Sequence, residues 1–171
     1  IRSKKEKIIF GSSPILNIKF WSEALKDIGT PSITLVKNFY SAINNRSDFD
    51  LHFEDLTPSF IKNKLINESL FPVFVWFYII KNAKTVVIPL HGIVLRDYFW
   101  KMEYVFLRLK KIKVIALPYG SDAFMYSKIR SKSIQHALIA DYPDAGKLEK
   151  KIKAKVFFWS KHADFITPGL I

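Results

Sequence analysis

Apolar and polar positions along this chain follow two different periods, and each period predicts a different kind of element. Nearly continuous apolar runs are typical of strands buried on both faces of a parallel sheet. The clearest such run covers residues 85–90; further strands are predicted over residues 7–10, 32–36, 113–117 and 163–167, and a weak alternation indicates a short strand within 50–56. Elsewhere apolar residues recur every three or four positions, which predicts helices over residues 14–28, 58–82, 95–109, 127–140 and 144–162.

The alternation of strands with helices predicts an α/β fold, a Rossmann-like parallel sheet flanked by helices. The chain has 171 residues without an internal repeat or linker, so we expect a single domain, 1–171. Two local rules add detail. Ser13 is expected to cap the first helix with Pro14 at its first position, and Pro72 is expected to break the long helix.

Three predicted strands end in small or polar residues. In open α/β sheets, ligands bind beyond the carboxyl ends of the strands, so we expect these residues to converge on one site. The candidates are Gly11, Ser12 and Ser13 after the first strand, His91 and Gly92 after residues 85–90, and Gly120, Ser121 and Asp122 after residues 113–117.

Each of these loops has more than one interpretation. Free amides after Gly11 favour a phosphate, although the loop could be a simple tight turn. His91 could donate a hydrogen bond or act as a general base, or it could be structural. Asp122 could accept a hydrogen bond from a sugar hydroxyl, take a proton, or cap the following turn. Neither G-x-G-x-x-G nor G-x-x-x-x-G-K-[ST] is present, so an NAD enzyme or a P-loop ATPase is not expected.

The amino-acid composition limits the cellular compartment that fits the chain and the cofactors that it can bind. A hydrophobic content of 49% excludes disorder. The sequence contains no Cys, which excludes disulfides and thiolate chemistry and fits the reducing cytoplasm. His52, His136 and His162 lack metal-ligand spacing, so we expect no metal. The longest apolar run, residues 70–80, is shorter than the roughly 20 residues of a membrane-spanning helix and is expected to be a buried helix.

The formal net charge of +12 favours anionic partners. Two predicted helices carry aromatic residues beside a cluster of basic ones. They could lie peripherally on an anionic membrane, at the inner face of the plasma membrane, or they could be solvated positive faces. No nucleic-acid-binding motif accompanies the charge, so we expect no nucleic-acid partner. The clusters are Arg96, Lys101, Arg108, Lys110, Lys111 and Lys113, and Lys147, Lys150, Lys151, Lys153 and Lys155.

Five short motifs occur together in a fixed order along the chain. They are Ile9-Phe-Gly-Ser-Ser-Pro14, Ile18-Lys-Phe-Trp-Ser-Glu-Ala-Leu25, His91-Gly92, Leu117-Pro-Tyr-Gly-Ser-Asp122 and Ala163-Asp-Phe-Ile166. This set resembles the amino-terminal, acceptor-side half of a GT-B-fold glycosyltransferase, of the retaining, family-four-like group that builds bacterial surface polysaccharides. The resemblance implies a second domain that binds most of the nucleotide-sugar. We therefore expect the chain to be a fragment, inactive by itself.

The resemblance also implies roles for individual residues. Gly11 and Ser12 match the loop that faces the donor diphosphate, although many members of the family carry two glycines there. His91 and Asp122 match positions near the acceptor hydroxyl. The implied reaction moves a hexosyl group from a nucleotide-sugar, a substrate rather than a cofactor, to a saccharide or lipid-linked acceptor. Two alternatives stay open, a non-catalytic phosphate- or nucleotide-binding α/β module and a basic membrane- or nucleic-acid-binding domain.

Overall fold

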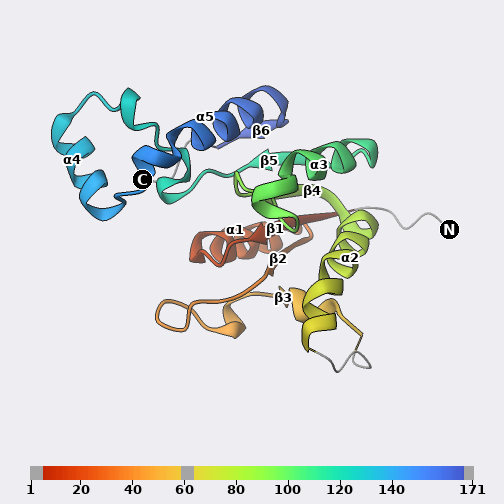
Figure 1. Ribbon diagram of the computed structural model, residues 1–171. Helices are drawn as coiled ribbons and strands as arrows, with labels where there is room; N and C mark the ends of the chain where they lie inside the picture. The colour runs from red at the N-terminus through yellow and green to blue at the C-terminus, as the bar shows by residue number, and fades with distance from the viewer. Residues whose placement is uncertain (1–5, 59–63, 168–171) are drawn as a thin grey trace.

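A parallel β-sheet forms the centre of the molecule. The computed structural model describes residues 6–58 and 64–167, and within them every strand pair is parallel, in the order β3-β2-β1-β4-β5-β6 (Figure 1). This arrangement confirms the predicted Rossmann-like α/β fold. The strands are β1 (Lys7–Ser12), β2 (Ser32–Val36), β3 (Leu51–His52), β4 (Ala83–Ile88), β5 (Lys113–Ala116) and β6 (Phe165–Ile166).

Helices flank both faces of the sheet. Within the described residues they are α1 (Leu16–Asp27), α2 (Lys64–Asn82), α3 (Arg96–Leu109), α4 (Lys132–Asp141) and α5 (Ala145–His162). Short 3₁₀ helices connect them: η1 (Arg46–Asp48), η2 (Phe53–Leu56), η3 (Gly120–Ala123) and η4 (Tyr126–Lys128). The helix α4 contributes no buried side chain and stands away from the sheet (Figure 1).

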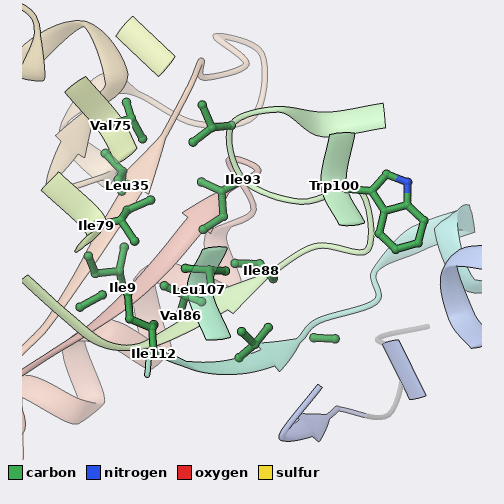
Figure 2. Packing of buried hydrophobic residues seen from close by; sticks show 14 of the residues in the cluster. Ile9, Leu35, Val75, Ile79, Val86, Ile88, Ile93, Trp100, Leu107 and Ile112 are labelled. Carbon is green, nitrogen blue, oxygen red and sulfur yellow. The ribbon is translucent and has the colours of Figure 1, made fainter. Parts of the chain in front are cut away.

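The sheet separates two apolar cores because neighbouring residues of a strand point to opposite faces. Ile9 and Val86 belong to the larger core, beneath α2, α3 and α5, whereas Phe10 and Val87 belong to the smaller core beneath α1. Figure 2 shows Ile79 of α2 and other buried side chains packed over the strands of the larger core. Each fully buried aliphatic side chain stabilises the fold by about 1.5–3 kcal/mol.

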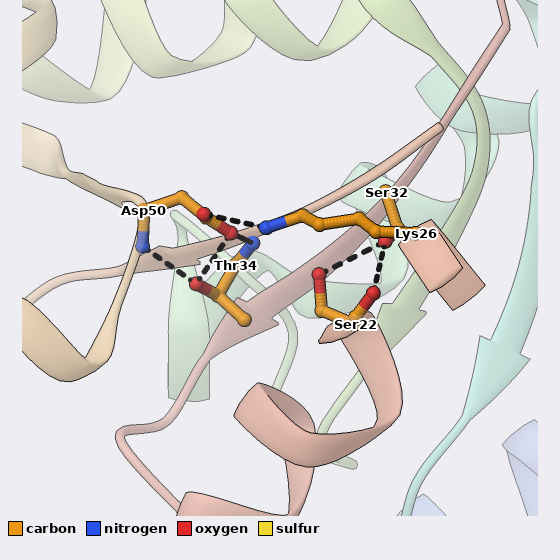
Figure 3. Close-up of polar contacts among 5 residues, drawn as sticks. All are labelled: Ser22, Lys26, Ser32, Thr34 and Asp50. Carbon is orange, nitrogen blue, oxygen red and sulfur yellow. Dashed lines mark hydrogen bonds and ion pairs between the residues drawn. The ribbon is translucent and has the colours of Figure 1, made fainter. Parts of the chain in front are cut away.

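A polar network ties α1 to β2 and to the segment before β3 (Figure 3). Asp50 accepts hydrogen bonds from the Thr34 amide at 2.8 Å and from Lys26 Nζ at 2.6 Å, while Ser22 and Ser32 pair at 3.0 Å. Burial disfavours the Asp50 charge, but Lys26 and Thr34 outweigh burial and lower the pKa of this carboxyl. The network therefore has a structural role, holding the strand beside β1 in place.

Two local predictions are wrong. The first helix begins at Leu16 with Ile15 at its N-cap, and Ser13 does not cap it. The helix α2 continues through Pro72, because packing of its buried residues Val75 and Ile79 offsets the backbone hydrogen bond that proline removes. Residues 59–63 of the predicted helix 58–82 lie outside the described part of the chain.

The remaining element boundaries differ from the prediction by a few residues. The segment predicted as a strand within 50–56 is a strand only at β3 and continues as η2. The helix predicted from residue 127 is preceded by η4, and α4 itself begins at Lys132, where Ser131 accepts a hydrogen bond from the Ile134 amide at 3.4 Å. Neither shift alters the order of the sheet.

Candidate functional site

The order in which the chain adds strands to the sheet reverses between β3 and β4, while all strands stay parallel. From β1 the chain runs through β2 to β3 at one edge, and it then crosses to β4, which lies on the other side of β1 and leads to β5 and β6. Because the strands are parallel, the loops after β1, β4 and β5 leave the same end of the sheet. This is the topological switch point, where open α/β sheets bind their ligands.

The end of β1, where Gly11 and Ser12 are the last two residues of the strand, and Ser13 directly after it are tightly packed. A Cβ atom on Gly11 would lie 2.8 Å from the Leu35 carbonyl oxygen, so a larger residue would push β1 away from β2. The peptide bond between Gly11 and Ser12 is cis. The side chains of Ser12 and Ser13 are buried and point to the neighbouring loops, because Ser12 Oγ lies 3.5 Å from the Gly92 carbonyl oxygen and Ser13 Oγ lies 2.6 Å from the Tyr119 hydroxyl.

The loop after β4 contains His91 and is held by a buried carboxylate. Glu103 of α3 is 0% exposed and accepts hydrogen bonds from the amides of Ile93 at 2.7 Å, Val94 at 2.6 Å and Leu95. Gly92 has φ +85°, and a Cβ atom there would lie 2.1 Å from Glu103 Oε2. The glycine therefore allows the loop to wrap around the carboxylate, and this wrapping sets the position of His91.

Asp122 lies in η3, immediately after β5. Its Oδ1 accepts a hydrogen bond from the Tyr119 amide at 2.9 Å, so one carboxylate oxygen caps the turn. Its Oδ2 is buried and makes no hydrogen bond of normal geometry to the described residues, although the Leu90 backbone amide lies near enough to act on the carboxyl. Burial raises the pKa of Asp122 to about 6, although the Tyr119 amide, the positive charge of Lys155 and the nearby Leu90 amide oppose the rise. The carboxyl thus titrates close to neutral pH.

Tyr119 connects the three loops. Its hydroxyl pairs with Ser13 after β1, its ring stands edge-on to the His91 ring with 6.5 Å between centroids, and its amide donates to Asp122. We call the residues held in this way the strand-end site. They are Gly11, Ser12, Ser13, His91, Gly92, Tyr119 and Asp122.

The helix α5 supports the strand-end site from the side of β5. Trp159 is fully buried, and its indole N–H donates to the Leu90 carbonyl at 2.8 Å, directly before His91. Lys155, one turn earlier on the same helix, supplies the positive charge that acts on Asp122. The loop after β4 is therefore fixed by Glu103 on one side and by Trp159 on the other.

The structure brings most of the candidate residues together. His91 and Asp122 share Tyr119 as a neighbour, and Ser13 reaches the same residue. Gly120 has φ +55°, a backbone conformation that suits a turn, and a Cβ atom there would meet open space. The side chain of Ser121 lies outside the part that the structure describes.

Sequence patterns did not single out Glu103, Tyr119 or Trp159. A signal for Glu103 is visible in retrospect, because it is an acidic residue between Met102 and Tyr104 on an apolar stretch of helix. Within the described residues, no group of three or more His, Cys, Asp and Glu side chains could hold a metal ion.

The chemistry available at the strand-end site is that of a titratable carboxyl beside an imidazole. A half-buried carboxylate whose Oδ2 makes no hydrogen bond to the described residues can accept one from a hydroxyl group of a ligand, and a pKa of about 6 suits proton transfer. The start of α1 adds positive potential, since its N-cap residue Ile15 forms no side-chain hydrogen bond to the first turn. The chain matches no protein-family model, no curated protein and no solved structure.

Proposed function

We propose that this chain is the acceptor-side domain of a GT-B-fold glycosyltransferase, which moves a hexosyl group from a nucleotide-sugar to a hydroxyl of a saccharide or lipid-linked acceptor. The observation that carries the proposal is the Asp122 carboxyl, which has a raised pKa and one unpartnered buried oxygen at the topological switch point. The ordered motifs of the sequence, from Ile9 to Ile166, support the same function by resemblance.

In this proposal Asp122 acts on the acceptor. Its ionised carboxylate accepts a hydrogen bond from the acceptor hydroxyl through Oδ2 and increases the electron density on the attacking oxygen. His91 donates a ring N–H to the reacting groups, and the edge-on contact with Tyr119 sets the orientation of its ring. The new bond joins the acceptor oxygen to the anomeric carbon, the proton of the acceptor hydroxyl passes to the Asp122 carboxylate, and the nucleoside diphosphate leaves with the electrons of the broken bond.

The donor diphosphate lies against the loop after β1. Ser13 Oγ already pairs with the Tyr119 hydroxyl, so the loop recognises an anion mainly through backbone amides and through the positive start of α1. A further domain of the parent protein binds the rest of the nucleotide-sugar, as the resemblance implies. The second candidate, a phosphate-binding module without catalysis, is favoured by this same uncapped helix start.

The test is sugar transfer by the full-length protein from a panel of nucleotide-sugars to saccharide acceptors. Asp122→Asn keeps an oxygen to accept from the Tyr119 amide but removes the charge, and we expect it to lower turnover about a hundredfold or more. We expect His91→Ala to have a similar effect. Asp27→Asn, at an exposed carboxyl at the end of α1, is the matched control and should leave turnover unchanged.

The outcomes separate the two candidates. Transfer that depends on Asp122 and His91 supports the glycosyltransferase. Binding of nucleoside diphosphates without transfer to any acceptor would support the phosphate-binding module and would refute the catalytic role of Asp122.

A further inference from the structure

The outward faces of α2 and α3 carry an unusual number of exposed apolar side chains. They are Leu70 (39% exposed), Val73 (46%) and Phe77 (66%) on α2, and Phe99 (54%), Met102 (48%), Val105 (52%), Phe106 (45%) and Leu109 (71%) on α3. Exposed apolar residues that are scattered singly need no explanation, whereas a contiguous patch marks a site of interaction.

The helix α3 carries two apolar stripes, one buried and one exposed. Its buried residues Trp100 and Leu107 face the core. Phe99 and Phe106 each directly precede one of them in the sequence, so they point to a different side of the helix, and both are exposed. An amphipathic surface helix needs only one apolar stripe to cover a core, so the second stripe, apart from the contact of Phe106 with Trp76, is not needed to cover the core of this domain.

The exposed stripes of the two helices form one surface. The ring of Trp76 on α2 contacts the ring of Phe106 on α3, with 6.3 Å between centroids. A shallow hollow of about 190 Å³ lies on α3 between Lys101, Met102, Val105 and Phe106. We call the eight exposed apolar residues and this hollow the α2–α3 face.

Basic residues border the α2–α3 face. Lys81 lies in the last turn of α2, Lys101 lies at the hollow, and Lys110 and Lys111 follow α3 directly. Among the described side chains of α2 and α3, the acidic one is Glu103, which is fully buried. The exposed charge of these two helices, in their described part, is therefore positive throughout.

We propose that the α2–α3 face docks on a membrane surface that contains anionic lipids. The Phe, Leu, Val and Met side chains enter the boundary between headgroups and acyl chains, and the bordering lysines lie at the level of the lipid phosphates. In the described part of the chain, no helix has the length and apolar character needed to cross a membrane. The docking is therefore interfacial and uses a surface distinct from the strand-end site.

Charge favours a lipid surface over a second copy of the chain. Two copies that met through this face would place their bordering lysines against each other, and each copy carries a formal net charge of +12. An anionic membrane instead complements both the apolar centre and the basic border of the face.

The depth of insertion can be measured directly, because the natural sequence contains no cysteine. Val105→Cys and Phe20→Cys variants of the protein are each labelled with a polarity-sensitive fluorophore. Val105 lies on the α2–α3 face, and Phe20, which is 57% exposed on α1, lies on the opposite face of the sheet. We expect vesicles of phosphatidylcholine with about 30% phosphatidylglycerol to shift the emission to the blue at position 105 and not at position 20.

Partitioning onto the same vesicles tests the apolar residues. We expect Phe77→Gln with Leu109→Gln to lower the partition coefficient about tenfold or more. The matched control is Phe20→Gln with Ile28→Gln, whose native side chains are 57% and 75% exposed on or beside α1, and it should change partitioning less than about twofold.

Substitutions of two lysine pairs distinguish docking by the α2–α3 face from a general electrostatic attraction between the basic protein and anionic vesicles. Lys81→Gln with Lys101→Gln and Lys150→Gln with Lys151→Gln remove the same net charge, but the second pair lies on α5. We expect the first pair to weaken binding about tenfold and clearly more than the second. Binding should also fall when NaCl is raised from about 0.05 to about 0.5 M.

Several results would overturn the proposal. They are no binding to anionic vesicles at low salt, equal spectral shifts at positions 105 and 20, and equal losses for a test pair and its control. A dimer in size-exclusion chromatography that dissociates on Phe77→Gln with Leu109→Gln would assign the face to self-association instead. The labelled Val105→Cys variant gives a result even if the glutamine variants fold poorly.

Discussion

Asp122→Asn removes a negative charge from a position where burial disfavours it. Burial raises the pKa of this carboxyl from its ordinary value of 3.8 to about 6. The folded chain therefore holds the proton more tightly than the unfolded chain. Its free energy of unfolding falls as the pH rises from about 4 to about 6, and the loss is complete above that window.

The size of this effect follows from the pKa difference. A pKa that is higher by about 2 corresponds to about 3 kcal/mol, and solvent screening of this half-buried group reduces the expected effect to about 1–2 kcal/mol. Asn at this position can still accept from the Tyr119 amide, so the turn is kept. We therefore expect Asp122→Asn to be more stable than the native chain at neutral pH, while turnover is lost.

The assay is urea unfolding followed by tryptophan fluorescence at about pH 4 and about pH 7.5. Other carboxyls also titrate in this range, and Asp50 with its lowered pKa acts in the opposite direction. The relevant quantity is thus the stability difference between variant and native chain at each pH. This difference should grow by about 1–2 kcal/mol in favour of Asn at the higher pH. A difference that does not depend on pH would show that Asp122 titrates normally, and the argument from burial would fail.

Three further substitutions test how the strand-end site is held. Glu103→Gln should lower the free energy of unfolding by about 2–3 kcal/mol, because a charge-assisted acceptor of three loop amides is lost; chemical denaturation measures it. Gly92→Ala should lower the free energy of unfolding by about 2 kcal/mol or more, since its Cβ would clash with Glu103 at a positive φ. Gly146→Ala within α5 is the control and should be neutral or stabilising; thermal unfolding measures both variants. Tyr119→Phe removes the hydrogen bond to Ser13 and should lower the free energy of unfolding by about 1 kcal/mol. It should also lower turnover at temperatures where the variant is still fully folded, which kinetics below its melting temperature would measure.

The fold was predictable from sequence because its main signals are local. Strands buried on both faces read as apolar runs, and adjacent residues such as Ile9 and Phe10 serve opposite cores. The positions of the strand-end loops follow from the same pattern, since each polar junction must leave the carboxyl end of its strand. All three interpretations of Asp122 were open at that level; the structure assigns one oxygen to the cap and leaves the other without a hydrogen bond of normal geometry to the described residues.

The contacts that organise the site were not predictable, because they join residues far apart in the chain. Ser13 follows the local rule for an N-cap, yet its hydroxyl pairs with Tyr119, which is 106 positions away. The helical spacing places Glu103 beside the apolar residues Trp100 and Leu107, but its partners, the loop amides after β4, become visible only in the folded chain. Pro72 shows the same limit, since packing of α2 on the sheet outweighs the local preference for a break.

The pH dependence of kcat/KM for sugar transfer by the full-length protein tests the central claim most directly. If an ionised Asp122 activates the acceptor hydroxyl, kcat/KM should rise as the pH increases through about 6, the pKa of this carboxyl. The Asp122→Asn protein should lack this rise and remain about a hundredfold slower at neutral pH. A native profile that is flat from about pH 5 to about pH 8, or a variant that keeps both the rise and the rate, would contradict the assignment of Asp122 to the reaction.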